Sequence, residues 1–162
     1  MNENDRVQVK SIVKGTVVLT DPDLHFRREW TKKGQINTIP FGILQDLIYQ
    51  PGVESMFTDG LLEIIDKKAR VELGLEVEGV APAKQIMTEA QMLGALVSGP
   101  DAVEKALDTL PEAQIEEFVQ LAVEKEITDM AKVDVIKKKT GKDVIALVKF
   151  NRQLQEEPRS ED

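Results

Sequence analysis

The chain has 162 residues, 41% of them apolar, and no cysteine. This length and composition fit one domain of ordinary size or two small ones around a hydrophobic core, and they exclude disorder throughout. The lack of cysteine excludes disulfides, a thiolate nucleophile and a zinc–thiolate site, which fits folding in a reducing cytosol. The first residues, 1–5, are polar and acidic, and no run of about 18 apolar residues occurs, so we expect neither a signal peptide nor a membrane protein.

The formal net charge of −8 is unevenly spread along the chain. Residues 1–35 carry seven basic and five acidic groups, whereas residues 36–162 carry fourteen basic and twenty-four acidic groups. Because affinity for nucleic acid rests chiefly on neutralising backbone phosphates, this balance disfavours nucleic acid as a general partner. It leaves room for one basic patch near the front of the chain.

The front of the chain has the pattern of strands. Residues 7–13 alternate apolar and polar, residues 16–20 are rich in β-branched side chains, and Lys14-Gly15 lies between the two runs. We therefore predict a hairpin of 7–13 with 16–20, and a second hairpin of 24–30 with 35–39.

A helical period follows from Pro40 onwards. The spacing of apolar residues predicts short helices at 41–50, 51–57 and 67–73, with a buried strand at 61–65. Gly74 lies just past the third of these helices, where a left-handed backbone is cheap for glycine. Residues 76–82 have the composition of a loop or linker.

The second half of the chain predicts five helices. Thr88 to Gln91 and Thr109 to Glu112 have the spacing of capping boxes, Thr128-Asp129 begins a fourth helix that Gly141 ends, and Asp143 begins a fifth. We expect the apolar side chains of the first and fifth of these helices to form their packed faces, namely Met92, Leu93, Leu96 and Val97 in the first and Val144, Ile145, Leu147, Val148 and Leu154 in the fifth.

The expected fold class is α+β: a small N-terminal antiparallel β unit with short helices, followed by a C-terminal all-helical bundle. The expected boundaries are a β-rich domain at 1–78, a linker at 79–87, a helical domain at 88–156 and a frayed tail at 157–162.

No set of residues predicts catalysis, a metal site or a cofactor site, so we expect no enzyme. His25 is the one histidine and has no nucleophile or carboxylate in a recognisable motif with it. Asp21 and Asp23 could bind a hard cation, but turns recruit aspartate to bond their own backbone more often. The run 140–143 lacks the glycine and hydroxyl of a phosphate loop, and Lys137-Lys138-Lys139 is typical of a solvated helix end.

The segment 26–34 surrounds two aromatic residues with cations. Phe26 and Trp30 have the same parity and fit the inward face of a strand, which would leave a solvated basic face. Alternatively, the segment contacts a partner, either by stacking arginine and aromatic side chains on bases or by gripping an acidic protein surface. The candidate residues for protein contact are Arg27, Arg28, Trp30, Lys32 and Lys33.

Several short motifs are shared with a known group of proteins, and they cover most of the chain: Pro22-Asp23-Leu24, Arg27-Arg28, Trp30, Lys33-Gly34, Ile39-Pro40, Tyr49, Pro51-Gly52-Val53, Phe57, Gly60, Gly74-Leu75-Glu76, Ile115-Glu116-Glu117, Ile127-Thr128-Asp129 and Asn151-Arg152. In these motifs the sequence resembles a family of small virion-associated structural proteins of tailed bacteriophages. The resemblance implies a capsid accessory, neck or tail protein of the virion, assembled in the host cytoplasm with other phage structural proteins. It implies no binding residues and no chemistry.

The first hypothesis is therefore a non-enzymatic structural or interaction protein, with self-association left open. Two alternatives remain: a nucleic-acid-binding module that uses the basic aromatic segment 26–34, and a phage-encoded inhibitor of a host protein whose acidic helical half mimics nucleic acid. An enzyme would have to build its site from dispersed Asp, Glu and Lys residues.

Overall fold

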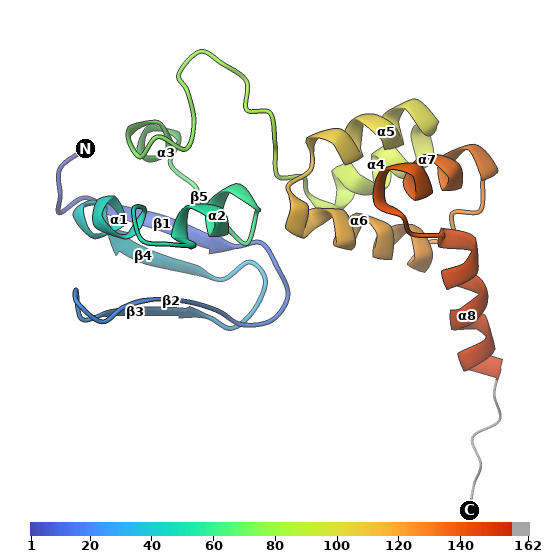
Figure 1. The fold of residues 1–162 in the computed structure, drawn as a ribbon, viewed down its shortest axis with the longest axis horizontal. Coiled ribbons are helices and arrows are strands. Elements are labelled where there is room, and N and C mark those ends of the chain that lie inside the picture. Colours follow the sequence, from blue (N-terminus) through green and yellow to red (C-terminus); the bar gives the residue numbers. More distant parts are fainter. Residues whose placement is uncertain (157–162) are drawn as a thin grey trace, which may run out of the picture. The chain divides into compact units, whose positions relative to one another are not determined.

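The computed structural model describes residues 1–156, which form two compact units (Figure 1). The N-terminal unit consists of Met1–Lys84 with Pro111–Ala113, and the C-terminal unit consists of Gln85–Leu110 with the residues from Gln114 onwards. All strands of the described residues lie in the N-terminal unit, and the five longest helices lie in the C-terminal unit. The expected α+β class is confirmed. The tail predicted at 157–162 lies outside the described residues.

The N-terminal unit contains two antiparallel sheets. Its strands are β1 (Arg6–Ser11), β2 (Val17–Asp21), β3 (Phe26–Trp30), β4 (Ile36–Pro40) and β5 (Leu62–Ile64). β1 is the centre of a three-stranded sheet in the order β4-β1-β5, with Val9 opposite both Asn37 and Ile64. β2 and β3 form a separate hairpin.

Both predicted hairpins pair the wrong strands. The strand at the front of the chain pairs with β4 and β5, and β2 pairs with β3 through the turn that follows Asp21. Alternation identifies a strand and its buried face, but it does not identify the neighbouring strand. Local turn chemistry decides the β2–β3 pairing, because the Asp21 carboxylate accepts hydrogen bonds from the backbone N–H groups of Asp23 and Leu24, at 2.9 and 3.4 Å.

The short helices and the late strand of the N-terminal unit are confirmed. The helices are α1 (Phe41–Leu47), α2 (Val53–Thr58) and α3 (Lys67–Glu72). Asp66 caps α3 by accepting a hydrogen bond from the backbone N–H of Lys68 at 2.8 Å. From α3, Arg70 donates to the carbonyl oxygens of Ile64 and Ile65, at 2.7 and 3.0 Å, so its guanidinium satisfies backbone oxygens at the end of β5.

The C-terminal unit is built from helices alone. They are α4 (Glu89–Ser98), α5 (Pro100–Thr109), α6 (Glu112–Glu124), α7 (Met130–Thr140) and α8 (Val144–Glu156). The capping box at Thr88 and Gln91, the Asp129 cap of α7 and the left-handed Gly141 after it are confirmed. Within residues 1–156, no helix has both the length and the apolar character needed to cross a bilayer.

The second predicted capping box does not form. Thr109 is the last residue of α5, and its hydroxyl donates back to the carbonyl oxygen of Lys105 at 2.9 Å. The Thr109 side chain thus bonds back along its own helix, whereas a capping threonine bonds the helix that follows it. Sequence spacing alone does not distinguish these two uses of threonine.

A buried side-chain amide fixes the segment that precedes α4. Gln114 is 1% exposed, accepts a hydrogen bond from the Met87 N–H at 2.9 Å and donates one to the Met87 carbonyl oxygen at 2.9 Å. It therefore acts as a strand would, by satisfying both backbone groups of one residue. The sequence does not predict this role of Gln114, because a polar residue within a helical apolar pattern gives no signal of its partner.

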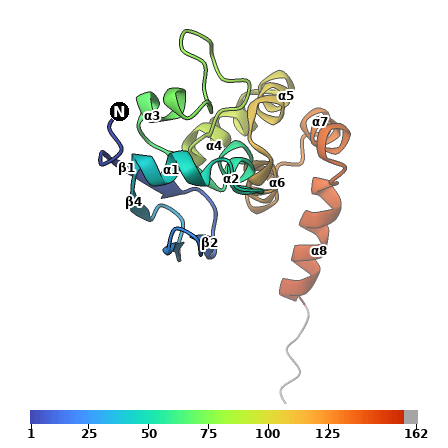
Figure 2. The ribbon, with the colours of Figure 1, turned by 60° about the vertical axis from the view of Figure 1, so that its left-hand side comes forward.

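The packed face predicted for the last helix is only partly correct. Val144 and Val148 of α8 are buried, whereas Leu147 and Leu154 are exposed. Figures 1 and 2 show that α8 extends away from the other helices of its unit beyond its first turns. A stripe that would be core in a longer bundle therefore has no neighbouring helix among the described residues. Val97 of α4, also predicted to be packed, is exposed as well.

Replacing Gln114 tests its structural role. We expect Gln114→Leu to lower the free energy of unfolding by about 2 kcal/mol. The variant loses both hydrogen bonds to Met87 and leaves the backbone N–H and carbonyl oxygen of Met87 unpaired. Urea denaturation followed by circular dichroism measures the change. Gln120→Leu is the matched control, since Gln120 lies exposed on the same helix, and equal losses in both variants would contradict the assigned role.

Candidate protein-contact surface

β3 divides its side chains between core and surface. Phe26 and Trp30 are buried, Arg28 is half-buried on the same face, and Arg27 and Glu29 are exposed on the other face. Trp30 is 0% exposed, and its indole Nε1 donates to the Val9 carbonyl oxygen at 2.9 Å. Trp30 is therefore removed from the candidate contact residues, because a side chain without exposed surface cannot touch a partner. The inward-face interpretation of Phe26 and Trp30 agrees with the structure.

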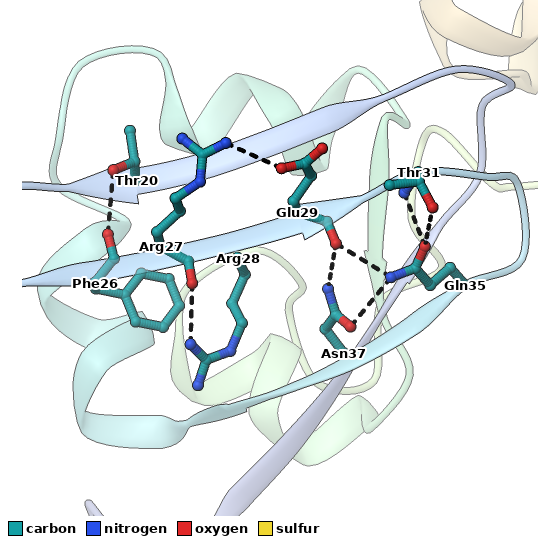
Figure 3. Close-up of polar contacts among 8 residues, drawn as sticks. All are labelled: Thr20, Phe26, Arg27, Arg28, Glu29, Thr31, Gln35 and Asn37. Atoms are coloured by element: carbon teal, nitrogen blue, oxygen red, sulfur yellow. Dashed lines mark hydrogen bonds and ion pairs between the residues drawn. The ribbon is translucent and has the colours of Figure 1, made fainter.

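The two arginines of β3 have different environments (Figure 3). Arg27 forms an ion pair with Glu29, with Nη2 and Oε2 3.0 Å apart, and both side chains are largely exposed. The Arg28 guanidinium lies 4.8 Å from the centre of the Phe26 ring and donates to the Arg27 carbonyl oxygen at 3.0 Å. Arg28 is thus held against the strand by a cation–π contact and a hydrogen bond, whereas Arg27 stands on the open face.

Side chains of Gln35, just before β4, and of Asn37, in β4, bond the backbone at the end of β3. Asn37 and Gln35 both donate to the Glu29 carbonyl oxygen, at 2.9 and 3.1 Å, and Gln35 accepts from the N–H and hydroxyl of Thr31, at 2.8 and 3.0 Å (Figure 3). Side-chain amides therefore satisfy the Glu29 carbonyl oxygen and the Thr31 N–H, at the end of β3. Such support reduces the freedom of the strand that presents Arg27 and Glu29.

The lysines of the segment lie at its far end. Lys32 and Lys33 are exposed in the turn between β3 and β4, where the Gly34 N–H donates to the Ser11 carbonyl oxygen at 2.8 Å. Both lysines lie beyond Trp30, where β3 ends, whereas Arg27 and Arg28 lie near its start. The structure therefore spreads these cations along β3 instead of gathering them. We use the name basic β3 surface for Arg27, Arg28, Glu29, Lys32 and Lys33.

The turn before β3 uses its polar residues structurally. The Asp21 carboxylate bonds the turn backbone, as predicted, while its buried Oδ2 has no hydrogen-bond partner among the described residues. His25 is exposed and adopts the left-handed conformation at φ 49°, which a tight hairpin turn requires of its last residue. Within residues 1–156, no group of three or more His, Asp or Glu residues is placed to hold a metal ion.

The lysine run at the end of α7 is not simply solvated. Lys139 reaches α5, where its ammonium lies 2.9 Å from an oxygen of Asp108 and 3.5 Å from one of Glu104. The hydrogen bond to Asp108 raises the pKa of Lys139. Lys137 lies 4.0 Å from Asp143, so two of the three lysines pair with carboxylates of the bundle. Asp143 also accepts a hydrogen bond from the Ala146 N–H at 3.1 Å, as expected for the residue that begins α8.

The hydrogen bond from the Thr31 N–H to the Gln35 side chain can be tested directly. We expect Gln35→Ala to accelerate hydrogen exchange of the Thr31 N–H and to lower the free energy of unfolding by about 1 kcal/mol, because that N–H loses its acceptor. Exchange followed by NMR measures the first effect, and urea denaturation followed by Trp30 fluorescence measures the second. Gln45→Ala, at an exposed position of α1, is the control; unchanged exchange at Thr31 in the Gln35 variant would contradict the assigned support.

Comparison with known proteins assigns no function to this surface. The resemblance to small phage virion proteins remains a hypothesis that these comparisons do not test, and the role of the basic β3 surface must be inferred from its own contacts, charges and exposure. No protein-family model, curated protein sequence or solved structure matches this chain.

Proposed function

We propose that the protein is a non-enzymatic structural or interaction protein that joins a larger assembly through protein–protein contacts. The observation that carries the proposal is the exposed basic β3 surface. Arg27 and Glu29 are exposed on β3, and the amides of Gln35 and Asn37 donate to the backbone of that strand at Glu29. A surface that is ordered before binding loses less conformational entropy when it meets a partner. The charge pattern fits a partner with acidic groups opposite Arg27 and Lys32.

The assembly that we propose is the virion of a tailed bacteriophage, with the protein as a capsid accessory, neck or tail component made in the host cytoplasm. Its support is the sequence resemblance described above. Modest contacts of this kind gain strength in symmetric assemblies, because many equivalent contacts act together.

Nucleic-acid binding by segment 26–34 is a weaker candidate for a structural reason. Phe26 and Trp30 are buried, so neither ring is available to stack on a base. The remaining route is a salt-sensitive phosphate contact through Arg27 and Lys32, which a salt titration with DNA detects directly.

The assembly role predicts the protein in purified particles. We expect mass spectrometry of particles of the phage that encodes this sequence to detect the chain in a fixed copy number relative to the other virion proteins. A stoichiometric amount that survives repeated density-gradient purification supports the proposal. Complete absence from particles, with the chain present in infected cells, overturns it.

Charge reversal tests the basic β3 surface as the point of contact. We expect Arg27→Glu to reduce incorporation into particles roughly tenfold, because it places like charges opposite one another across the interface. Quantitative mass spectrometry of particles made with each variant measures incorporation. Lys68→Glu is the matched control, since Lys68 is an exposed cation on α3 of the same unit. Equal incorporation of both variants would remove this surface from the proposal.

A further inference from the structure

α8 has two apolar faces, and its own unit covers only one of them. Val144 and Val148 lie in the core of the C-terminal unit. Leu147, Phe150 and Leu154 are 37%, 57% and 56% exposed. Their i, i+3, i+7 spacing places them in one stripe, about 120° around the helix from the buried valines. We call these three residues the outer stripe.

An exposed ion pair connects α8 to the end of α6. Both guanidinium nitrogens Nε and Nη2 of Arg152 donate to the carboxylate of Glu126, at 3.1 and 2.8 Å. The hydrogen bonds and charge of Arg152 lower the pKa of Glu126, so the pair is ionised at neutral pH. The two residues are 26 positions apart, and the contact joins the end of α6 to the exposed half of α8.

Glu126 has a left-handed backbone at the end of α6. Glu126 adopts φ 50° just past α6, and the N–H of Ile127 donates to the Ala122 carbonyl oxygen at 2.9 Å, which is the helix-ending motif that glycine normally serves. A glycine there would avoid the strain but would provide no carboxylate for Arg152. The residue that ends α6 is therefore also the residue that pairs with Arg152 of α8.

Asp143, four residues before Leu147, lies in line with the outer stripe at its N-terminal end and is paired with Lys137. Between residues 146 and 154, the positions beside the stripe are uncharged. By helical periodicity, its flanking positions are Ala146, Asn151 and Gln153, whereas Lys149 and Arg152 lie on the opposite half of the helix. The chain as a whole has a net charge of −8, which opposes self-association elsewhere on its surface. At the outer stripe, two copies can approach without bringing like charges together.

The spacing of the stripe is nearly the same in both directions. Leu147 lies three residues before Phe150 and Leu154 lies four residues after it. In an antiparallel pair with a two-fold axis near residues 150 and 151, Leu147 of each copy faces Leu154 of the other, and the two Phe150 side chains meet at the centre. Such an isologous contact uses one surface twice.

We propose that the outer stripe binds the outer stripe of a second copy of this chain, with the two α8 helices antiparallel. The inference rests on the proposed assembly role, for which it supplies one contact and its partner. Two short helical segments bury far less than the about 1,600 Å² of a standard interface, so we expect a dissociation constant on the order of 0.1 mM. A contact of this strength acts where copies are concentrated in an assembly.

Engineered cysteines test the antiparallel geometry, because the chain has no cysteine of its own. We prepare full-length Leu147→Cys and Leu154→Cys variants and oxidise them at about 0.3 mM, separately and mixed. Facing positions 147 and 154 form a disulfide only in the mixture, since equal positions are about 10 Å apart along the helix axis. We expect the mixture to give several-fold more cross-linked dimer than either variant alone or than Lys149→Cys, on the opposite side of the helix.

Equal cross-linking in the separate and mixed samples would overturn the antiparallel pairing, and so would its absence from the mixture. Sedimentation equilibrium supplies a second measurement. We expect Phe150→Asp to raise the dissociation constant at least tenfold, whereas Lys149→Asp leaves it within about twofold. Thermal unfolding checks that both variants fold; because Phe150 is exposed, its replacement should leave the melting temperature unchanged.

The outcomes separate this inference from the proposed function. A wild-type chain that stays monomeric at about 1 mM overturns the self-contact, even if purified particles contain the protein. Absence of the protein from particles overturns the assembly role, whereas the dimer is measured on the isolated chain and does not depend on that result.

Discussion

Side chains, and not a backbone ladder, join the two sheets of the N-terminal unit. Among the described residues, β3 and β4 belong to separate sheets although they lie beside each other. The Trp30 indole of the hairpin donates to the Val9 carbonyl oxygen of β1. The amides of Gln35, just before β4, and Asn37, in β4, donate to the Glu29 carbonyl oxygen of β3. The hairpin keeps its place through these hydrogen bonds and through the core that it shares with the three-stranded sheet, where Phe26 and Trp30 cluster with Val9.

This arrangement explains why the front of the chain can carry both a core and a contact surface. The inward face of β3 places Phe26 and Trp30 in the core, and the outward face leaves Arg27 and Glu29 exposed. The two amide side chains also occupy the Glu29 carbonyl oxygen, which is then not open for pairing with another strand. The neutral amides of Gln35 and Asn37 therefore fix the backbone at Glu29 without changing the charge of the surface.

The C-terminal unit places its polar groups at helix ends for the most part. Thr88, Asp129 and Asp143 begin helices, and Gly141 ends one. Gln114 and the Glu126–Arg152 pair have a different role, because each connects segments distant in the sequence. These long-range polar contacts position the segment before α4 and the exposed half of α8, where apolar packing alone gives little direction.

The existence and type of most elements follow from the sequence, because period, caps and turn residues act within a few positions of one another. Alternation marks the strands, the spacing of Thr88 and Gln91 marks a capping box, and the turn chemistry of Asp21 is correctly assigned. Parity along β3 likewise separates its buried aromatics from its exposed charges. All of these signals are local.

Only the tertiary structure decides which strands pair, which threonine caps a helix and which apolar stripe is covered. β1 pairs with β4 and β5, the Thr109 hydroxyl bonds its own helix, and Leu147 and Leu154 are exposed although they have the same composition as a core face. Each outcome depends on residues far away in the chain. Local sequence determines what each segment can form, and long-range packing determines what it meets, because burial and hydrogen bonding are settled by neighbours in space.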